Sequence, residues 1–458
     1  MNELFENVVQ NLATSNSSVS VTAAAGCGKT EAIAQAVAIA DGKHLVLTHT
    51  NAGVAALRSR LRKYSVSESK YRVETIASWL LKYAIAYPSM SGFENPHPQG
   101  TDWNEVYPAA QNLLSFSFIT DILQTTYQTV FIDEYQDCTQ SQHKVITKIS
   151  EYLPVRILGD PLQGIFGFHE QTVNWQIDIE QNFQPLPDLQ TPFRWSRTNP
   201  TLGLQLSDIR NKLLNNEQID LENFPDIDWY SLDNNREIEI CENARMNKTG
   251  TVVGIHQWPS DAHSSAKKMK GKYQSIEEMD CNDLMIAAQK IDNWRIQKNY
   301  QAIKNEVKNF ILKGCGNRSP FQDPNFLETE FLELEQGNLS VMSRIVEKTI
   351  QNSKMHVFRR ELFCEMKKAV EEFSSGESES FEEAAYKVRY KTRINGRRPE
   401  KRIISRTLLI KGLEFDHALV LNADSLQNKE NFYVAITRGS RSLTILSKTP
   451  LLHYSENS

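Results

Sequence analysis

The chain has 458 residues, of which 40% are hydrophobic and 23% are charged, and its formal net charge is −5 at pH 7. This length is more than one hydrophobic core usually organises, so we expect two to four domains. The acidic balance excludes a globally basic nucleic-acid coat, and any DNA binding must come from a local groove. No apolar run is long enough to span a bilayer, so we expect no membrane partner.

The cysteines and the N-terminus indicate the compartment. The six cysteines are scattered, without Cys-x-x-Cys pairs. A zinc site and a disulfide framework are therefore not expected, and a reducing compartment, the cytoplasm, is the natural prediction. The first ten residues carry acidic side chains and no basic flank, which does not fit a secretory signal.

The N-terminal stretch leads from a predicted helix into a candidate phosphate-binding loop. Residues 1–12 have an amphipathic helical pattern, in which Gln10 could hydrogen-bond an adenine edge; an exposed helix glutamine is the equal alternative. An apolar strand, 19–22, runs into Thr-Ala-Ala-Ala-Gly-Cys-Gly-Lys-Thr at 22–30. An alanine-rich helical run, 31–40, follows directly.

This strand–loop–helix order is the setting that a phosphate-binding loop requires. Gly26 and Gly28 let backbone amides curl around an anion. Lys29 supplies a charge for the β- and γ-phosphates, and Thr30 supplies a hydroxyl for Mg²⁺. The strict pattern opens with glycine where this chain has Ala23. The alternative is an alanine/glycine turn in front of a core helix.

Polar residues follow the next two predicted strands. Strand 44–48 leads into Thr-His-Thr-Asn at 48–51, and strand 71–74 leads to Thr75. Ligands of open α/β sheets bind at the carboxyl ends of parallel strands, so both ends are candidate contacts. Residues 87–108 are rich in Pro, Gly, Ser and Asn without a period, which predicts a loop or a small insertion.

Two adjacent carboxylates, Asp133 and Glu134, follow a central-strand run at 129–132. In a chain that also has a phosphate loop, the first acid would hold Mg²⁺ and the second would orient the attacking water. The alternative is a helix N-cap.

Another strand, 155–158, precedes Gln163, which could sense a γ-phosphate. Phe166 and Phe168 follow it. They are either core residues or side chains that stack on bases.

The remaining elements are less regular. A proline-punctuated connector, 185–200, contains Arg194. Residues 386–393 alternate basic and aromatic side chains at strand spacing, which indicates either a nucleic-acid path or a solvated edge strand. Arg438 follows an apolar helical run and is either a surface residue or a cleft residue. We predict strands over 237–241, 251–256, 417–421 and 443–446, and helices over 202–214, 262–270, 276–312 and 340–373.

Taken in order, these stretches resemble the motifs of superfamily 1 helicases of the UvrD/Rep/PcrA type. The resemblance runs along the whole chain, although the middle matches poorly. In this family the first motif begins with alanine, which accounts for Ala23. The matching segments are 23–30, 48–51, 75–79, 133–137, 159–168, 193–194, 411–415 and 433–438.

The resemblance implies an α/β fold with two RecA-like P-loop domains, whose parallel sheets are flanked by helices, plus reduced, mainly helical insertions. The implied domains are 1A over 1–195, with a small insertion at about 80–128, 2A over 196–274 and 399–458, and a reduced helical insertion over 275–398.

The resemblance also implies the cofactors ATP and Mg²⁺ and a role for each site residue. The cofactor-binding residues are Gln10, Gly26, Cys27, Gly28, Lys29, Thr30 and Glu414, with Thr30 and Asp133 on the metal. The catalytic residues are Glu134 as the base, Gln163, and the two arginines Arg194 and Arg438, which reach across from the second side. The DNA-binding residues are Thr50, Asn51, Thr75, Phe166 and Phe168.

The implied function is ATP-driven 3′ to 5′ movement on single-stranded DNA, or on DNA with single-stranded ends. Ala24, Cys27, Ala77 and Leu408 depart from the family pattern and put duplex unwinding more in question than hydrolysis. The compact form also resembles the helicase-like subunit of the Gabija anti-phage system, which works beside an OLD-type nuclease. The alternative function is an ATP-gated DNA-end sensor that regulates a partner nuclease in anti-phage defence, without processive unwinding.

Overall fold

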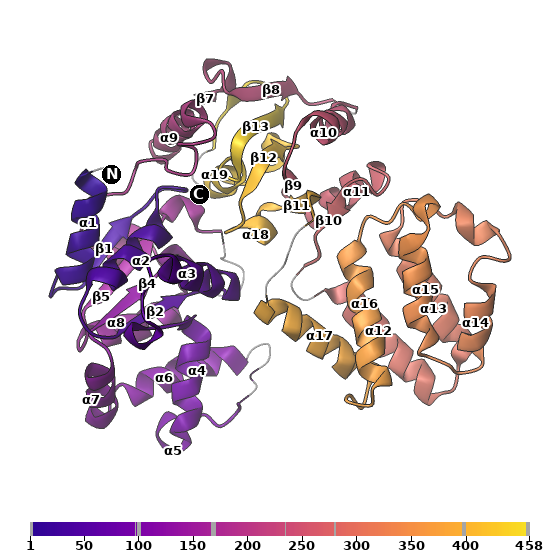
Figure 1. Ribbon diagram of the computed structural model, residues 1–458, viewed down its shortest axis with the longest axis horizontal. Helices are drawn as coiled ribbons and strands as arrows, with labels where there is room; N and C mark the ends of the chain where they lie inside the picture. Colours follow the sequence, from indigo (N-terminus) through magenta and orange to yellow (C-terminus); the bar gives the residue numbers. More distant parts are fainter. Residues whose placement is uncertain are drawn as a thin grey trace. The chain divides into compact units, whose positions relative to one another are not determined.

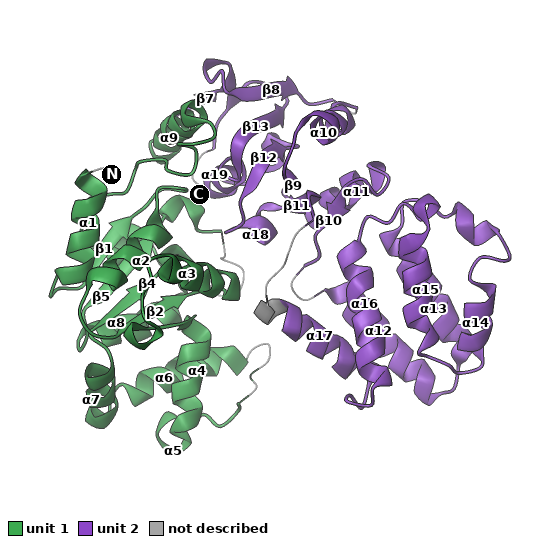
Figure 2. Cartoon of the chain, viewed as in Figure 1, with its two compact units in different colours: residues 1–215 green, residues 216–458 purple. Residues whose placement is uncertain are grey.

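The structure is a computed structural model that describes residues 3–96, 98, 102–165, 171–233, 235–278, 281–395 and 400–454, except the side chains of 393–395. The chain divides into two compact units, residues 1–215 and 216–458 (Figure 2). In the described ranges, no helix is both long and apolar enough to cross a membrane.

Unit 1 is built on a six-stranded parallel sheet. The strands lie in the order β3-β2-β4-β5-β1-β6, so the first strand of the chain lies between β5 and the edge strand β6. Their bounds are β1 Val19–Thr22, β2 His44–Thr48, β3 Tyr71–Thr75, β4 Thr129–Ile132, β5 Val155–Gly159 and β6 Gln184–Pro185.

Helices cover both faces of this sheet, because side chains alternate between the faces along each strand. Phe131 of β4 packs with helices α1 (Glu3–Thr14), α2 (Lys29–Ile39) and α3 (Asn51–Lys63). Its neighbours Val130 and Ile132 pack on the opposite side. There they meet α4 Ile76–Ala86, α6 Trp103–Leu113, α7 Ser117–Thr126 and α8 Gln140–Ser150. A short helix α5 (Pro88–Ser91) precedes α6, and α9 (Pro200–Leu214) is the last helix of unit 1.

Unit 2 contains a second six-stranded parallel sheet, in the order β10-β11-β9-β12-β13-β8. The bounds are β8 Ile227–Ser231, β9 Val252–His256, β10 Gln274–Ser275, β11 Arg402–Arg406, β12 Phe415–Val420 and β13 Gly439–Ser447. Helices α10 (Arg236–Asn247) and α11 (Pro259–Lys268) pack on one face. The predicted α/β class with two parallel sheets flanked by helices is therefore confirmed.

A helical insertion separates β10 from β11 and has a hydrophobic core of its own (Figure 1). Its helices are α12 Asn282–Ile296, α13 Tyr300–Gly314, α14 Glu328–Glu335, α15 Val341–Gln351, α16 Arg360–Ser374 and α17 Phe381–Asn395. The predicted long helical stretches over 276–312 and 340–373 are each two helices.

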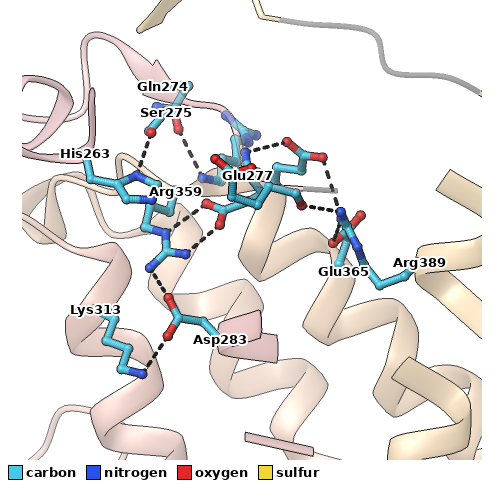
Figure 3. Close-up of polar contacts among 12 residues, drawn as sticks. His263, Gln274, Ser275, Glu277, Asp283, Lys313, Arg359, Glu365 and Arg389 are labelled. Atoms are coloured by element: carbon cyan, nitrogen blue, oxygen red, sulfur yellow. Dashed lines mark hydrogen bonds and ion pairs between the residues drawn. The ribbon is translucent and has the colours of Figure 1, made fainter. Parts of the chain in front are cut away.

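Buried ion pairs join this insertion to the strand that leads into it (Figure 3). The Arg359 guanidinium donates to both carboxylate oxygens of Glu277, at 2.8 and 2.5 Å, and to Asp283 at 2.7 Å. Arg389 of α17 pairs with Glu365 of α16 and donates to the backbone carbonyl of Glu278 at 2.6 Å. The start and the end of the insertion are thus held by bonded buried charges.

Two predictions from local pattern are wrong. Residues 237–241 lie in helix α10, where Ile240, Cys241 and Ala244 face the core at helical spacing. Residues 386–393 lie in helix α17, so Tyr386 and Tyr390 share one face and their rings stack. In both cases tertiary burial outweighs the local pattern. The stretch 87–108, predicted as a loop or a small insertion, contains α5 and most of α6.

Candidate functional site

The candidate residues of unit 1 gather at the carboxyl edge of its sheet. Since all strands are parallel, each strand ends at the same edge. Thr75 is the last residue of β3, and Thr50, Asp133 and Asp160 follow β2, β4 and β5. The phosphate loop follows β1. This edge is where open α/β sheets bind ligands.

The loop between β1 and α2 has the backbone geometry of an anion cradle. Gly26 and Gly28 have φ values of +71° and +88°, a region that favours glycine. A Cβ at Gly26 would meet Trp195 at 2.7 Å, and one at Gly28 would meet Phe5 at 3.1 Å. The loop therefore has no room for a side chain at Gly26 and is crowded at Gly28, and the backbone of both positions favours glycine. Helix α2 begins at Lys29, which directs its N-terminus toward the loop.

Lys29 lies against the two acids at the end of β4. Its Nζ atom is 2.9 Å from Glu134 Oε2 and 4.0 Å from Asp133 Oδ1. The Thr30 hydroxyl donates to Asp133 Oδ2 at 3.3 Å. The structure thus brings together four residues that the sequence singled out from two segments about a hundred positions apart. A lysine, a hydroxyl and two carboxylates can hold a phosphate–metal pair and a water.

Burial and charge shift the pKa values of this cluster. Asp133 is 3% exposed, and desolvation together with the Glu134 charge raises its pKa to about 7, although Lys29 opposes the shift. Burial lowers the pKa of Lys29, but the Glu134 and Asp133 carboxylates outweigh it, so its pKa is raised. Burial also raises the pKa of the Cys27 thiol to about 12, which makes this loop cysteine a poor nucleophile.

Glu134 has a strained backbone. Its φ and ψ are 59° and 39°, in the left-handed region that non-glycine residues rarely adopt. Such strain costs about 1–3 kcal/mol and persists where surrounding contacts over-determine the conformation. Here the turn bends the chain after β4, and the backbone N–H of Glu134 donates to Asp133 Oδ1 at 3.0 Å.

Three residues that the sequence analysis did not single out, Gln136, Asp160 and Arg210, are connected to Glu134 by hydrogen bonds and an ion pair. The Gln136 side chain bonds both Glu134 and the backbone N–H of Asp160, and Arg210 of α9 pairs with Asp160 at 3.1 Å. The predicted Gln163 joins them by donating to Asp160 Oδ2 at 2.9 Å. Arg210 could have been found, since it lies four residues after Leu206 on the buried stripe of α9.

Arg194 lies beside the phosphate loop and belongs to unit 1. The expectation that it reaches the nucleotide from the second domain does not fit this position. Its backbone N–H donates to the Gly26 carbonyl at 3.1 Å. The neighbouring Phe193 ring meets Phe5 edge to face, at 5.4 Å between centroids. A narrow surface recess, too small to enclose a water molecule, is lined by Leu4, Phe5, Cys27, Leu189, Gln190, Thr191 and Phe193. Gln10 lies exposed in α1 and is not among these lining residues, so its adenine contact stays a prediction.

The predicted DNA-contact residues have structural roles that the sequence did not reveal. The Thr50 hydroxyl caps α3 by accepting from Gly53 N–H at 3.0 Å, and the Thr75 hydroxyl caps α4 by accepting from Ser78 N–H at 3.1 Å. Asn51 is the first residue of α3. Phe166 and Phe168 lie outside the described residues. Contact of all five with DNA stays a prediction.

The predicted residues of unit 2 lie close to one another. Arg438 donates to the carbonyls of Val434 at 2.8 Å and Leu413 at 3.1 Å, and to the Thr437 hydroxyl at 2.9 Å. Glu414 is exposed directly after Leu413. Arg438 is 1% exposed, which corrects the expectation of an arginine that is either a surface residue or a solvent-facing cleft residue.

Comparisons with known proteins were made against families, curated proteins and solved structures. Residues 95–184 match the model of the UvrD/REP helicase N-terminal domain. This match includes Asp133, Glu134 and Gln163. No curated protein matches the chain.

Two of the similar solved structures are Pif1 helicases. One, from Bacteroides in complex with ADP-AlF3 and ssDNA, is 13% identical, with a TM-score of 0.32 over 58% of this chain and 56% of that chain. The other, from Candida albicans, is 11% identical, with a TM-score of 0.34 over 60% of this chain and 55% of that chain. The chain thus matches only a little over half the length of these proteins.

Proposed function

We propose that this chain, a superfamily 1 helicase by the match of residues 95–184 to the UvrD/REP helicase N-terminal domain, is an ATP-hydrolysing motor that moves on single-stranded DNA. The observation that carries the proposal is the cluster of Lys29, Thr30, Asp133 and Glu134 at the carboxyl edge of the first sheet. The glycine cradle beside it supports the same conclusion, because both positions have positive φ and Gly26 has no room for a Cβ.

The residues present fit ATP with Mg²⁺. The amides from Gly26 to Gly28 and the Lys29 ammonium would bind the phosphates, and Thr30 and Asp133 would hold the metal, which supplies charge neutralisation when bound. Glu134 would accept a proton from the attacking water and orient it. In the described arrangement Lys29 pairs with Glu134, so nucleotide binding must redirect the lysine toward phosphate.

Unit 2, which contains the second sheet, would supply further residues to the nucleotide site. By resemblance, Arg438 and Glu414 of unit 2 contribute to the nucleotide site, as Arg194 does from unit 1, and Gln163 couples the γ-phosphate to DNA. The domain division predicted from the sequence, with 1A ending at 195, stays part of the proposal. Closing and opening of two lobes around a phosphate would drive movement along stacked bases.

Direction and unwinding are tested by strand displacement. We expect the protein with ATP and Mg²⁺ to displace a short duplex that carries a 3′ single-stranded tail and to leave a 5′-tailed duplex intact. Displacement only from the 5′ tail would overturn the proposed 3′ to 5′ direction. DNA-stimulated hydrolysis without any displacement would instead favour the sensor function, in which an OLD-type nuclease is the partner.

A further inference from the structure

We propose that Gln136 is a positioning residue that holds Glu134 for hydrolysis, and that Asp160 and Arg210 fix Gln136 in turn. The inference deepens the proposed ATPase function and rests on it. It assigns to the fourth residue after β4, and to a buried arginine of α9, a part in controlling the candidate base.

Gln136 has one geometry that satisfies both of its neighbours. Its Nε2 donates to Glu134 Oε2 at 2.6 Å, and its Oε1 accepts from the Asp160 N–H at 2.9 Å. A carboxylate only accepts and a backbone N–H only donates, so the amide orientation is fixed. Gln136 is 3% exposed, which keeps both bonds away from competing water.

The end of β5 is shaped to admit this side chain. A Cβ at Gly159 would lie 2.8 Å from Gln136 Oε1 and 2.5 Å from the Trp175 ring. Gly159 has no positive φ, so the need for glycine here is one of space. The amide of Gln136 can therefore reach the Asp160 N–H only because position 159 has no side chain.

Asp160 is the point at which the contacts meet. Its side chain is fully buried, with Oδ1 paired to Arg210 at 3.1 Å and Oδ2 accepting from Gln163 at 2.9 Å. Arg210 is itself 7% exposed. A buried, bonded ion pair holds its geometry, since losing one partner leaves an uncompensated charge. Helix α9 ends at Leu214, where the chain continues into unit 2. The contacts thus connect the candidate base to the last helix of unit 1.

The chemistry gives Gln136 a specific role. Gln136 donates to the same oxygen of Glu134 with which Lys29 forms its ion pair. Once phosphate takes Lys29, Gln136 still holds Oε2, which orients the carboxylate with Oε1 toward the water. The strained backbone of Glu134 makes this support necessary, because a strained residue relaxes when its contacts are removed.

The first test compares Gln136→Ala with Gln142→Ala. Gln142 is a matched control: it is 6% exposed, lies in the same segment and donates to the Tyr107 hydroxyl at 2.9 Å, away from Glu134. We expect Gln136→Ala to lower kcat for ATP about 10- to 100-fold, the usual cost of losing the partner behind a functional ligand. Nucleotide affinity should stay within about twofold. Gln142→Ala should change melting temperature but not kcat.

The second variant, Gln136→Glu, gives a readout that packing alone would not move. It keeps an acceptor for the Asp160 N–H but places a second carboxylate beside Glu134. Like charge raises the pKa of the base, so the acid limb of the kcat–pH profile should move up by about one unit or more. An unshifted limb would contradict contact between the two side chains during turnover.

The role of Arg210 is tested by combining its substitution with that of Gln136. We expect Arg210→Met to lower kcat as Gln136→Ala does, Arg210→Lys to retain part of the rate, and the double variant Gln136→Ala/Arg210→Met to be no slower than the slower single variant. Effects that multiply in the double variant would mean that the two residues act separately.

The outcomes separate the inference from the function on which it rests. If the wild-type chain binds nucleotide but does not hydrolyse it, the proposed function and the inference both fail. If the wild type hydrolyses ATP, Glu134→Gln is inactive, and Gln136→Ala keeps kcat within about twofold, only the inference fails. A fall in kcat matched by an equal fall in nucleotide affinity would assign Gln136 to the fold instead.

Discussion

At the residue scale, Lys29 and Glu134 form an ion pair, but we expect their replacement to impair different steps, nucleotide binding and hydrolysis respectively. Lys29→Ala removes the phosphate charge, so nucleotide affinity should fall about tenfold or more. Glu134→Gln keeps the cradle and removes the base, so affinity should persist while single-turnover hydrolysis falls about 10²–10⁴-fold. Titration with a fluorescent nucleotide and a quenched-flow assay measure the two effects. Normal turnover in Glu134→Gln would contradict its role as the base.

Asp133 predicts how the stability of unit 1 depends on pH when metal is absent. Burial raises its pKa from 3.8 to about 7, so the folded chain holds this proton more tightly than the unfolded chain does. The stabilisation is complete below about pH 4 and is lost as pH rises through about 7. Asp133→Asn removes this loss. We expect the variant to gain stability relative to wild type on going from pH 5 to pH 8, by up to about 3 kcal/mol.

The measurement is urea unfolding of both proteins at each pH in the presence of EDTA. The difference between the two proteins isolates Asp133 from the other titrating groups. A difference that stays constant between pH 5 and pH 8 would contradict the raised pKa.

Arg438 is a stabilising residue as well as a candidate for catalysis. Its guanidinium is fully buried and donates to two backbone carbonyls, so Arg438→Ala should cost about 1–3 kcal/mol of unfolding free energy through unsatisfied acceptors. Arg441→Ala is the control, since that side chain is 49% exposed and its pair with Asp416 should be worth about 1 kcal/mol or less. Equal melting temperatures for Arg438→Ala and wild type would contradict the burial.

At the element scale, most of the buried strands could be predicted from the sequence, whereas β8 and β11 could not. Apolar runs such as 129–132 are buried on both faces, so their composition alone identifies them. Strand β8 was missed because it lies at the edge of its sheet and is partly exposed, with Tyr230 at 38%. Helix α17 was misjudged because Arg389, a charged residue, faces inward to Glu365.

Helix α17 is therefore expected to depend on its buried ion pair. Arg389→Met leaves Glu365 buried without its cation and should destabilise the insertion by about 3–5 kcal/mol. The double variant Arg389→Met/Glu365→Met should recover most of that loss, because two apolar side chains need no partner. Denaturant unfolding monitored by circular dichroism measures both. If the double variant is as unstable as the single variant, the pair is not the cause.

At the scale of the whole molecule, the main residues of the candidate site in unit 1 could be predicted from the sequence. The residues that hold them in place could not. Lys29, Thr30, Asp133 and Glu134 stand out because glycines, a lysine and paired acids follow apolar strands. Gln136 and Arg210 belong to no comparable sequence pattern. Their roles depend on which strand ends lie next to one another, and the order β4-β5-β1 is a property of the fold rather than of any local segment.

The most direct test of the central claim is the steady-state ATP hydrolysis rate with and without single-stranded DNA. Because the chain is net acidic, DNA must bind a local surface, and stimulation should weaken as salt increases. We expect a DNA-dependent increase in kcat of about tenfold or more in the wild type, and a rate at least about 10²-fold lower in Glu134→Gln with or without DNA. A wild-type rate that single-stranded DNA leaves unchanged would contradict the account of this chain as a DNA motor.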